Sequence, residues 1–121
     1  DNISTTLNKC KSIPYDKNMT DDKKNMLYIR WPDLLVGEAS CKKDQKFWKN
    51  EYEKHGTCCE ESYNQEQYFD LAMGLKDKFD LSNSLGRYGI IPGKSYPVQI
   101  INSTVKAITQ GFPRLSCTNL M

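Results

Sequence analysis

Local sequence patterns predict one domain that is mostly helical. A chain of 121 residues is long enough to bury one hydrophobic core but not two. The strongest helical pattern covers residues 64–79, and Asn64 and Gln67 have the spacing of a reciprocal capping pair at its start. Its apolar side chains recur with the helical period at Tyr68, Leu71, Ala72, Leu75 and Phe79.

The first third of the chain predicts one helix between two charged loops. Residues 12–24 are rich in lysine and aspartate and predict a solvated loop. A helix then runs to Arg30, with Thr20 or Asp21 as its cap, and it stops at Trp31 because the residue before a proline avoids helical backbone angles. Met26, Leu27 and Arg30 share one face, which we interpret as core packing. Residues 38–46, around Cys41, predict a second exposed loop.

The last third predicts short elements separated by turns. Residues 81–88 predict a helix that ends at Gly89. Residues 96–101 mix apolar and polar side chains in an extended style, and Asn102 or Ser103 is expected to cap a helix that continues to Gly111. Residues 113–117 predict the start of a strand.

Composition favours a secreted globular protein and excludes a disordered tail or a strongly basic chain. The net charge is +2 and 38% of the residues are hydrophobic. No apolar run is long enough to span a bilayer. Glycosylation sequons begin at Asn2, Asn18 and Asn102, where roughly one would arise by chance, and five cysteines agree with an oxidising compartment. Their odd number leaves at least one without a partner within the chain.

Residues 47–59 concentrate the side chains that can carry chemistry. In a helix, Glu51 and His55 share one face, with Trp48 on the same stripe and Lys54 beside them. A carboxylate, an ammonium and an imidazole can perform acid–base work on a charged substrate. The alternative is a surface helix with Glu–Lys pairs and a histidine that suits the helix dipole, and composition alone favours this alternative.

The cysteines beside this histidine fit a structural role better than a metal or a nucleophile. His55 and Cys58, with the adjacent Cys59, have no Cys-x-x-Cys pair to complete four zinc ligands. A Cys–His nucleophile pair would also need a third, orienting group. A disulfide is therefore the preferred interpretation of Cys58.

The order Phe-Trp-x-x-Glu-Tyr-x-Lys-His-Gly-Thr-Cys in residues 47–58 resembles the second catalytic signature of the RNase T2 family of secreted ribonucleases. The S-locus ribonucleases of plant self-incompatibility are the most similar group. Four more segments resemble theirs in the right order, at residues 31–34, 68–69, 89–92 and 111–117. The resemblance implies one ribonuclease domain over 1–121 with an α+β fold, in which helices pack on an antiparallel sheet and the active site lies in a cleft across it.

The resemblance also implies an activity, that of an endoribonuclease. The ribose 2′-hydroxyl attacks the neighbouring phosphorus and leaves a 2′,3′-cyclic phosphate, without a metal or other cofactor. His55 would act as the base, Lys54 would stabilise the phosphorane oxygens, and Glu51 would orient or polarise the site. Trp48, Asp1 and Asn50 are the expected substrate contacts. Asn50 stands where many members have a second histidine, so we expect a changed rate or pH profile and not a lost activity.

Two further expectations concern the cysteines and the chain's extent. The family pattern pairs Cys10 with Cys58 and leaves Cys41 and Cys59 unassigned. Asp1 resembles the last residue of the family's first signature, which supplies the catalytic acid, and Cys117 resembles a cysteine whose partner lies beyond Met121. The resemblance therefore implies an internal fragment of a longer enzyme, nearly inactive by itself.

The implied biological role is that of a secreted, monomeric toxin in the style, acting in gametophytic self-incompatibility. Its partners would be RNA and a pollen-side recognition protein of the F-box type, with no membrane association. Residues 12–24 and 38–46 are the expected contacts with the pollen protein. The alternative is a non-catalytic secreted glycoprotein of the same fold, serving binding or storage.

Overall fold

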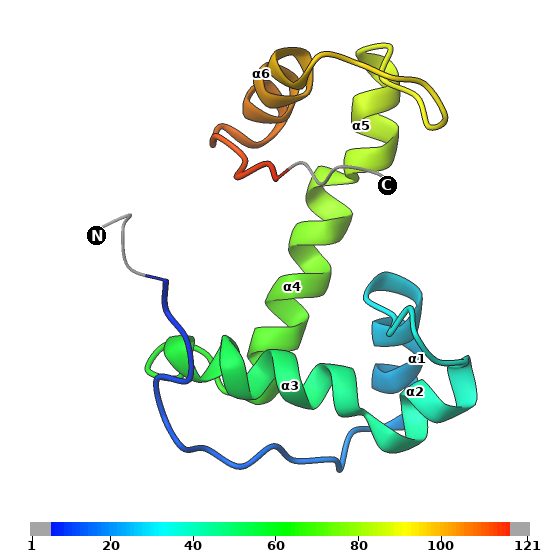
Figure 1. Cartoon of the computed structure of the whole chain (residues 1–121). Helices are drawn as coiled ribbons and strands as arrows, with labels where there is room; N and C mark the ends of the chain where they lie inside the picture. The colour runs from blue at the N-terminus through cyan, green and yellow to red at the C-terminus, as the bar shows by residue number, and fades with distance from the viewer. Residues whose placement is uncertain (1–5, 117–121) are drawn as a thin grey trace. The chain divides into compact units, whose positions relative to one another are not determined.

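The computed structural model describes residues 6–116 (Figure 1). It divides into two compact units, residues 1–74 and residues 75–121, which are described separately below. Within the described range all regular structure is helical. The elements are α1 (Asp21–Arg30), α2 (Glu38–Asp44), α3 (Lys46–Lys54), the 3-10 helix η1 (Gly56–Cys59), α4 (Gln65–Phe79), α5 (Leu81–Arg87) and α6 (Val98–Thr109). None of these helices combines the length and the apolar character that crossing a membrane requires.

Helix α1 confirms the prediction made from its capping residues. The side chain of Thr20 accepts a hydrogen bond from the backbone N–H of Lys23 at 3.2 Å. Asp21 and Asp22 occupy the first turn, where the helix dipole favours negative charge. The helix ends at Arg30, one residue before the Trp31-Pro32 pair.

Helix α2 corrects the expectation of a charged loop at residues 38–46. Glu38–Asp44 is helical, and Gln45, in the left-handed region at φ 55°, redirects the chain into α3. Most side chains of α2 are charged or polar, but Cys41 is only 3% exposed and packs in the core. This one buried residue was not evident from the charged sequence. The Gln45 side chain accepts a hydrogen bond from the Tyr15 hydroxyl at 2.8 Å, which fixes this junction.

Helix α4 begins with the predicted capping pair. The backbone N–H of Gln67 donates to the Asn64 side chain at 2.9 Å, and that of Asn64 donates to the Gln67 side chain at 3.0 Å. Phe69 and Met73, one turn apart, are the buried residues of the helix. Leu71, one of the periodic apolar side chains, is 39% exposed. The periodicity therefore predicted the helix correctly but did not indicate which side chains it buries.

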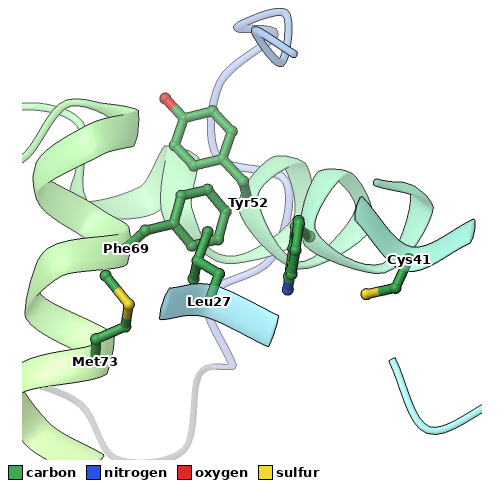
Figure 2. Close-up of a cluster of buried hydrophobic side chains, with 6 residues drawn as sticks. Leu27, Cys41, Tyr52, Phe69 and Met73 are labelled. Carbon is green, nitrogen blue, oxygen red and sulfur yellow. The ribbon is translucent and has the colours of Figure 1, made fainter. Parts of the chain in front are cut away.

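The core of residues 1–74 is largely aromatic, and α3 contributes Trp48 and Tyr52 to it. Its buried side chains come from α1, α2, α3 and α4, and most are seen in Figure 2: Leu27, Cys41, Trp48, Tyr52, Phe69 and Met73. Tyr52 and Phe69 lie with ring centroids 6.3 Å apart, and Tyr52 and Tyr68 at 5.8 Å. Such packing contributes both buried apolar area and favourable ring geometry. The aromatic core thus fixes the helix that carries the candidate catalytic residues.

In residues 75–121 the predicted helix of residues 81–88 is present as α5, and α6 corrects the expectation of an extended segment. Helix α6 begins at Val98, directly after Pro97, so residues 98–101 are helical. Ser103, expected as a cap, instead donates its hydroxyl to the backbone oxygen of Gln99 at 2.8 Å inside the helix. Proline before the first turn explains the earlier start, since its fixed φ suits a helix N-terminus.

The strand expected at residues 113–117 is absent from 113–116, and Cys117 lies outside the described residues. More generally, residues 6–116 contain no strand, so the antiparallel sheet that the family resemblance implies is not seen in the part of the chain that the structure describes.

Candidate active site

The last turn of α3 brings Glu51 and His55 to one side of the helix. The backbone N–H of His55 donates to the carbonyl oxygen of Glu51 at 2.9 Å, which continues the helical hydrogen bonding through His55. His55 itself leaves the helical region, at φ −120° and ψ −42°, and caps the helix. Both side chains are half-buried. This arrangement confirms that the two residues lie one turn apart at the end of a helix.

Lys54 and Asn50 are exposed on the same helix. Lys49 pairs with Glu53 at 3.7 Å, but no carboxylate within residues 6–116 forms an ion pair with Lys54. Its ammonium group is therefore available to an anionic ligand. Asn50 offers an amide that can donate a hydrogen bond to a phosphate oxygen.

Trp48 does not fit its predicted role as a substrate contact. Its side chain is 0% exposed, and the indole N–H donates to the backbone oxygen of Trp31 at 2.8 Å. A ring with no exposed face cannot stack on a base of a bound nucleic acid. Trp48 instead packs α3 against the segment that follows α1. The helical spacing of Trp48 alone does not tell whether its side chain contacts the core or a ligand.

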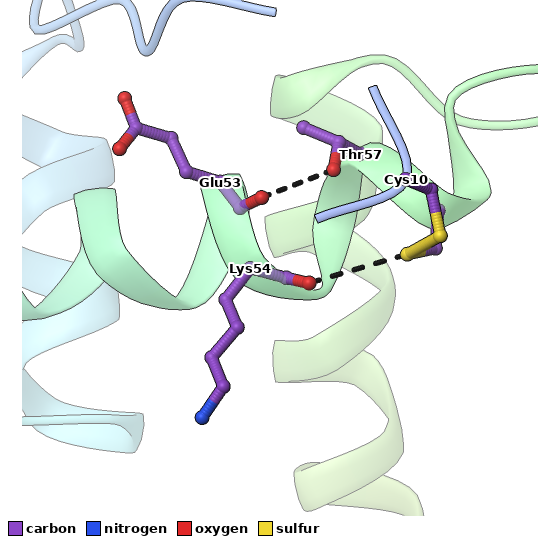
Figure 3. Close-up of a disulfide and its surroundings, with 5 residues drawn as sticks. Cys10, Glu53, Lys54 and Thr57 are labelled. Carbon is purple, nitrogen blue, oxygen red and sulfur yellow. Dashed lines mark hydrogen bonds between the residues drawn. A yellow bond between two sulfur atoms is a disulfide. The ribbon is translucent and has the colours of Figure 1, made fainter. Parts of the chain in front are cut away.

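A disulfide and two hydrogen bonds to backbone oxygens hold the chain on both sides of this turn. Figure 3 shows the disulfide and the bond from Thr57 to Glu53. Cys10 and Cys58 are joined, as the family resemblance implies. The backbone N–H of Lys9 donates to the carbonyl oxygen of Lys54 at 2.7 Å. The Thr57 hydroxyl donates to the backbone oxygen of Glu53 at 3.1 Å, and Cys58 Sγ, which has no proton in the disulfide, lies 4.0 Å from the Lys54 oxygen. The carbonyl end of α3 is thereby fixed to residues 9–10.

Gly56 has a structural role that the sequence pattern did not reveal. Helix α3 ends at Lys54 with His55 as its cap, directly before the glycine. A Cβ atom at residue 56 would lie 2.3 Å from Cδ2 of Tyr52. The absence of a side chain therefore lets η1 pack directly on the Tyr52 ring, immediately after His55.

Tyr68 is a neighbour of the site that sequence reasoning assigned only to the scaffold. Burial raises the pKa of its phenol, and the negative charge of Glu51 raises that pKa further. Burial likewise raises the pKa of Tyr52, with a smaller contribution from Glu60. The Tyr68 ring lies 5.8 Å, between centroids, from that of Tyr52, the residue after Glu51. No signal within the 47–59 motif could have found this neighbour, because Tyr68 comes from α4.

The other predicted site residues lie away from this turn or outside the described range. Asp1 and Asn2 belong to residues 1–5, which are not described. Asn18 is exposed and Asn102 is partly buried in α6. Cys41 is buried and Cys59 exposed, and neither forms a disulfide with a described cysteine. Within residues 6–116, no group of three His, Cys, Asp or Glu side chains is placed to bind a metal ion.

Comparison with known proteins decides the family. The sequence model of the ribonuclease T2 family matches residues 1–120. The chain belongs to the ribonuclease T2 family. This confirms the resemblance drawn from residues 47–58 and from the four shorter segments.

The relatives include ribonucleases of Nicotiana alata. Ribonuclease S-7 of Nicotiana alata is 64% identical over 121 residues, which cover 98% of this chain and 56% of the relative. The crystal structure of the Nicotiana alata SF11-RNase, associated with gametophytic self-incompatibility, matches with a TM-score of 0.91 and 39% identity, covering 100% of this chain and 62% of that one.

A third match is more distant. A variant of RNase MC1 in complex with 5′-GMP matches with a TM-score of 0.74 and 31% identity, over 89% of this chain and 55% of that one. The RNase T2-type fold is therefore confirmed. The chain spans a little over half the length of the relatives that it matches.

Proposed function

We propose that the protein acts as an endoribonuclease that cleaves RNA by transesterification. The ribose 2′-hydroxyl attacks the adjacent phosphorus, and the products carry a 2′,3′-cyclic phosphate and a free 5′-hydroxyl. The observation that carries this proposal is the last turn of α3, in a chain of the ribonuclease T2 family. It places Glu51, Lys54 and His55 within one turn, and no carboxylate of residues 6–116 forms an ion pair with Lys54. The rival function, a non-catalytic glycoprotein for binding or storage, is not favoured, since the matched relatives are ribonucleases.

Each residue of the turn has a separate role in this proposal. His55 removes the proton of the 2′-hydroxyl, since an imidazole exchanges protons near neutral pH. Lys54 stabilises the negative charge that develops on the phosphorane oxygens. Glu51 orients the imidazole or the substrate, and Asn50 donates a hydrogen bond to the phosphate.

The proposed acid is not among these residues. His55 is the only histidine of the chain, so we assign protonation of the leaving 5′-oxygen to a group outside the 121 residues. Asp1 stays proposed as a contact to the base edge. The mechanism requires no metal or other cofactor, because every step is a proton transfer or a charge stabilisation that side chains can perform.

The wider role and setting rest on the relatives. We propose a secreted, monomeric toxin of the style that acts in gametophytic self-incompatibility, with N-glycans at Asn2, Asn18 and Asn102. The proposed pollen-side partner, of the F-box type, contacts residues 12–24 and 38–46, which comprise a loop, the first turn of α1, and α2 with the residues that follow it. We also propose that in the whole domain the helices pack on an antiparallel sheet, which the similarity to the SF11-RNase supports.

The test is RNA cleavage by the protein expressed from its complete coding sequence. Replacing the base by His55→Asn should lower the cleavage rate by about 10²–10⁴-fold, the usual contribution of a general base. Lys54→Gln should lower it by about 10²–10³-fold. Lys49→Gln is the matched control, because it removes a lysine of the same helix that is paired with Glu53. Unchanged circular dichroism and melting of each variant would separate lost chemistry from lost folding.

Two outcomes would contradict the proposal. A His55→Asn variant that retains full activity would remove the imidazole from the mechanism. Equal losses in the Lys54→Gln and Lys49→Gln variants would show that the lysines act only through the overall charge of the helix.

A further inference from the structure

A cavity of about 230 Å³ lies where the loop of residues 16–20 meets the start of α4, within residues 1–74. Asp16, Asn18, Met19 and Thr20 line it from the loop side. Lys23 lines it from α1, and Gln65 and Glu66 line it from α4. The candidate active site uses none of these residues.

The backbone that borders this cavity is fixed by side-chain hydrogen bonds. The amide of Gln65 accepts from the backbone N–H of Asp16 at 2.8 Å and donates to the backbone oxygen of Asp16 at 2.7 Å. The Asp16 carboxylate accepts from the backbone N–H of Asn18 at 2.8 Å. Thr20 is held in turn as the cap of α1. The cavity is thus bordered by an ordered loop and not by a loose one.

Asn18 is the exception in this network. Its backbone N–H is bonded, but its side-chain amide makes no hydrogen bond to any residue of the described range, and the residue is exposed. Asn18, Met19 and Thr20 form a glycosylation sequon. An unbonded asparagine amide of a sequon therefore opens directly onto a polar cavity.

We propose that Asn18 carries an N-linked glycan and that its first sugar, N-acetylglucosamine, occupies this cavity. In the attachment step a bond forms between Asn18 Nδ2 and C1 of the sugar. The bond between C1 and an oxygen of the lipid pyrophosphate donor breaks, and the proton lost from Nδ2 balances the negative charge of the departing pyrophosphate. The sugar then extends from the residue that already lines the cavity.

The chemistry of the cavity wall suits this sugar. Sugar hydroxyls and the acetamido N–H donate hydrogen bonds, and the carboxylates of Asp16 and Glu66 accept them. Lys23 is 8% exposed and is bonded to Asp70, with Glu66 at 3.8 Å. Its ammonium is thus positioned as a donor to the acetamido oxygen, and partly buried Met19 supplies an apolar surface for the acetamido methyl.

The glycan is therefore expected to stabilise the junction of α1 and α4 through its first sugar alone. The outer sugars extend into solvent and contribute no contact. Asn102 provides the comparison, because it lies within α6 and does not line this cavity. This inference rests on the N-glycan proposed above for Asn18 and adds the site that its first sugar occupies. It is independent of the proposed RNA cleavage, so a failed cleavage assay would leave it intact.

The experiment uses protein secreted by a host that adds N-glycans. Glycopeptide mass spectrometry should find Asn18 modified. Trimming the native protein with an endoglycosidase that leaves one N-acetylglucosamine should leave the melting temperature unchanged. Asn18→Gln should lower it by about 3 °C, the size expected when a domain of this length loses one or two hydrogen bonds. Asn102→Gln should stay within about 1 °C of the unsubstituted protein.

Two controls isolate the sugar from the substitution. Unglycosylated protein with and without Asn18→Gln should melt at the same temperature. Nuclear Overhauser contacts between the acetamido methyl of the sugar and the Met19 methyl should be present in the single-sugar form. An unmodified Asn18 overturns the proposal. So does a modified Asn18 that lacks the Overhauser contact and whose loss leaves the melting temperature unchanged.

Discussion

Residues 6–74 and residues 75–116 differ in how far they bury their apolar side chains. All six buried hydrophobic residues of the described range belong to the first region. In the second region Thr104 alone is buried among the described residues, while Val98, Ile100 and Phe112 are 45%, 47% and 69% exposed. Both regions are equally helical. The comparison teaches that a helical pattern in the sequence specifies the helix but not whether its apolar face finds partners.

The candidate active site lies on the region that has its own core. Trp48 and Tyr52 bury one face of α3, and this leaves Glu51 and His55 at its partly exposed end. The disulfide and the Lys9–Lys54 hydrogen bond then fix the final turn. Precise placement of catalytic groups requires such a rigid support. The core of the first region is therefore part of the site's construction.

The largest expected effect comes from removing the centre of this core. Trp48→Ala should lower the free energy of unfolding by about 3–5 kcal/mol, because it removes a fully buried ring and leaves a cavity. Ile100→Ala, at a half-exposed residue of the second region, should cost no more than about 1 kcal/mol. Urea unfolding followed by circular dichroism measures both. Equal losses for the two variants would contradict the contrast between the regions.

Replacing one glycine by alanine in each region should change the stability in opposite directions, and by less than the Trp48→Ala substitution. Gly56→Ala should destabilise by about 1–3 kcal/mol, since the new Cβ would overlap the Tyr52 ring. Gly86→Ala lies inside α5, and apart from its chain neighbours and the helix's own backbone no atom lies within 4 Å of the new Cβ, so it should stabilise by about 0.5–1 kcal/mol. The melting temperatures of the two variants should therefore move in opposite directions. A stabilising Gly56→Ala would show that the Tyr52 ring moves aside at little cost.

Elements whose signals lie within a few residues were predicted from the sequence. The Thr20 cap of α1 and the Asn64–Gln67 pair of α4 depend on neighbours three residues apart, so the local sequence contains the whole interaction. Helix α2 and the start of α6 were not predicted. Helix α2 depends on Cys41, which packs in a core built mainly by other helices. Helix α6 starts early because Pro97 favours a helix start, and this outweighed the extended pattern of residues 96–101.

In the candidate site too, features set by local spacing were predicted and features set by tertiary packing were not. The spacing of Glu51 and His55 was enough to place them on one side of a helix. The role of Trp48 was not predictable, because periodicity does not tell whether a stripe faces the core or a ligand. The roles of Tyr68 and Gly56 were missed because both depend on tertiary packing against the Tyr52 ring. His55 is the only histidine of the sequence, so these residues supply no second imidazole to the proposed mechanism.

The smallest expected effect is a loss of stability at alkaline pH that arises from the aromatic core of the first region. Burial raises the pKa of Tyr15, Tyr52 and Tyr68 above the unfolded value of about 10. Their contribution is fully present below pH 10 and is lost as the pH rises from there through the raised pKa values, because the unfolded chain ionises first. The urea unfolding free energy, measured from pH 8 to 11.5, should begin to fall near pH 10. Tyr68→Phe removes one of the three groups and should make the fall less steep, whereas an unfolding free energy that stays constant to pH 11.5 would contradict burial of these phenols.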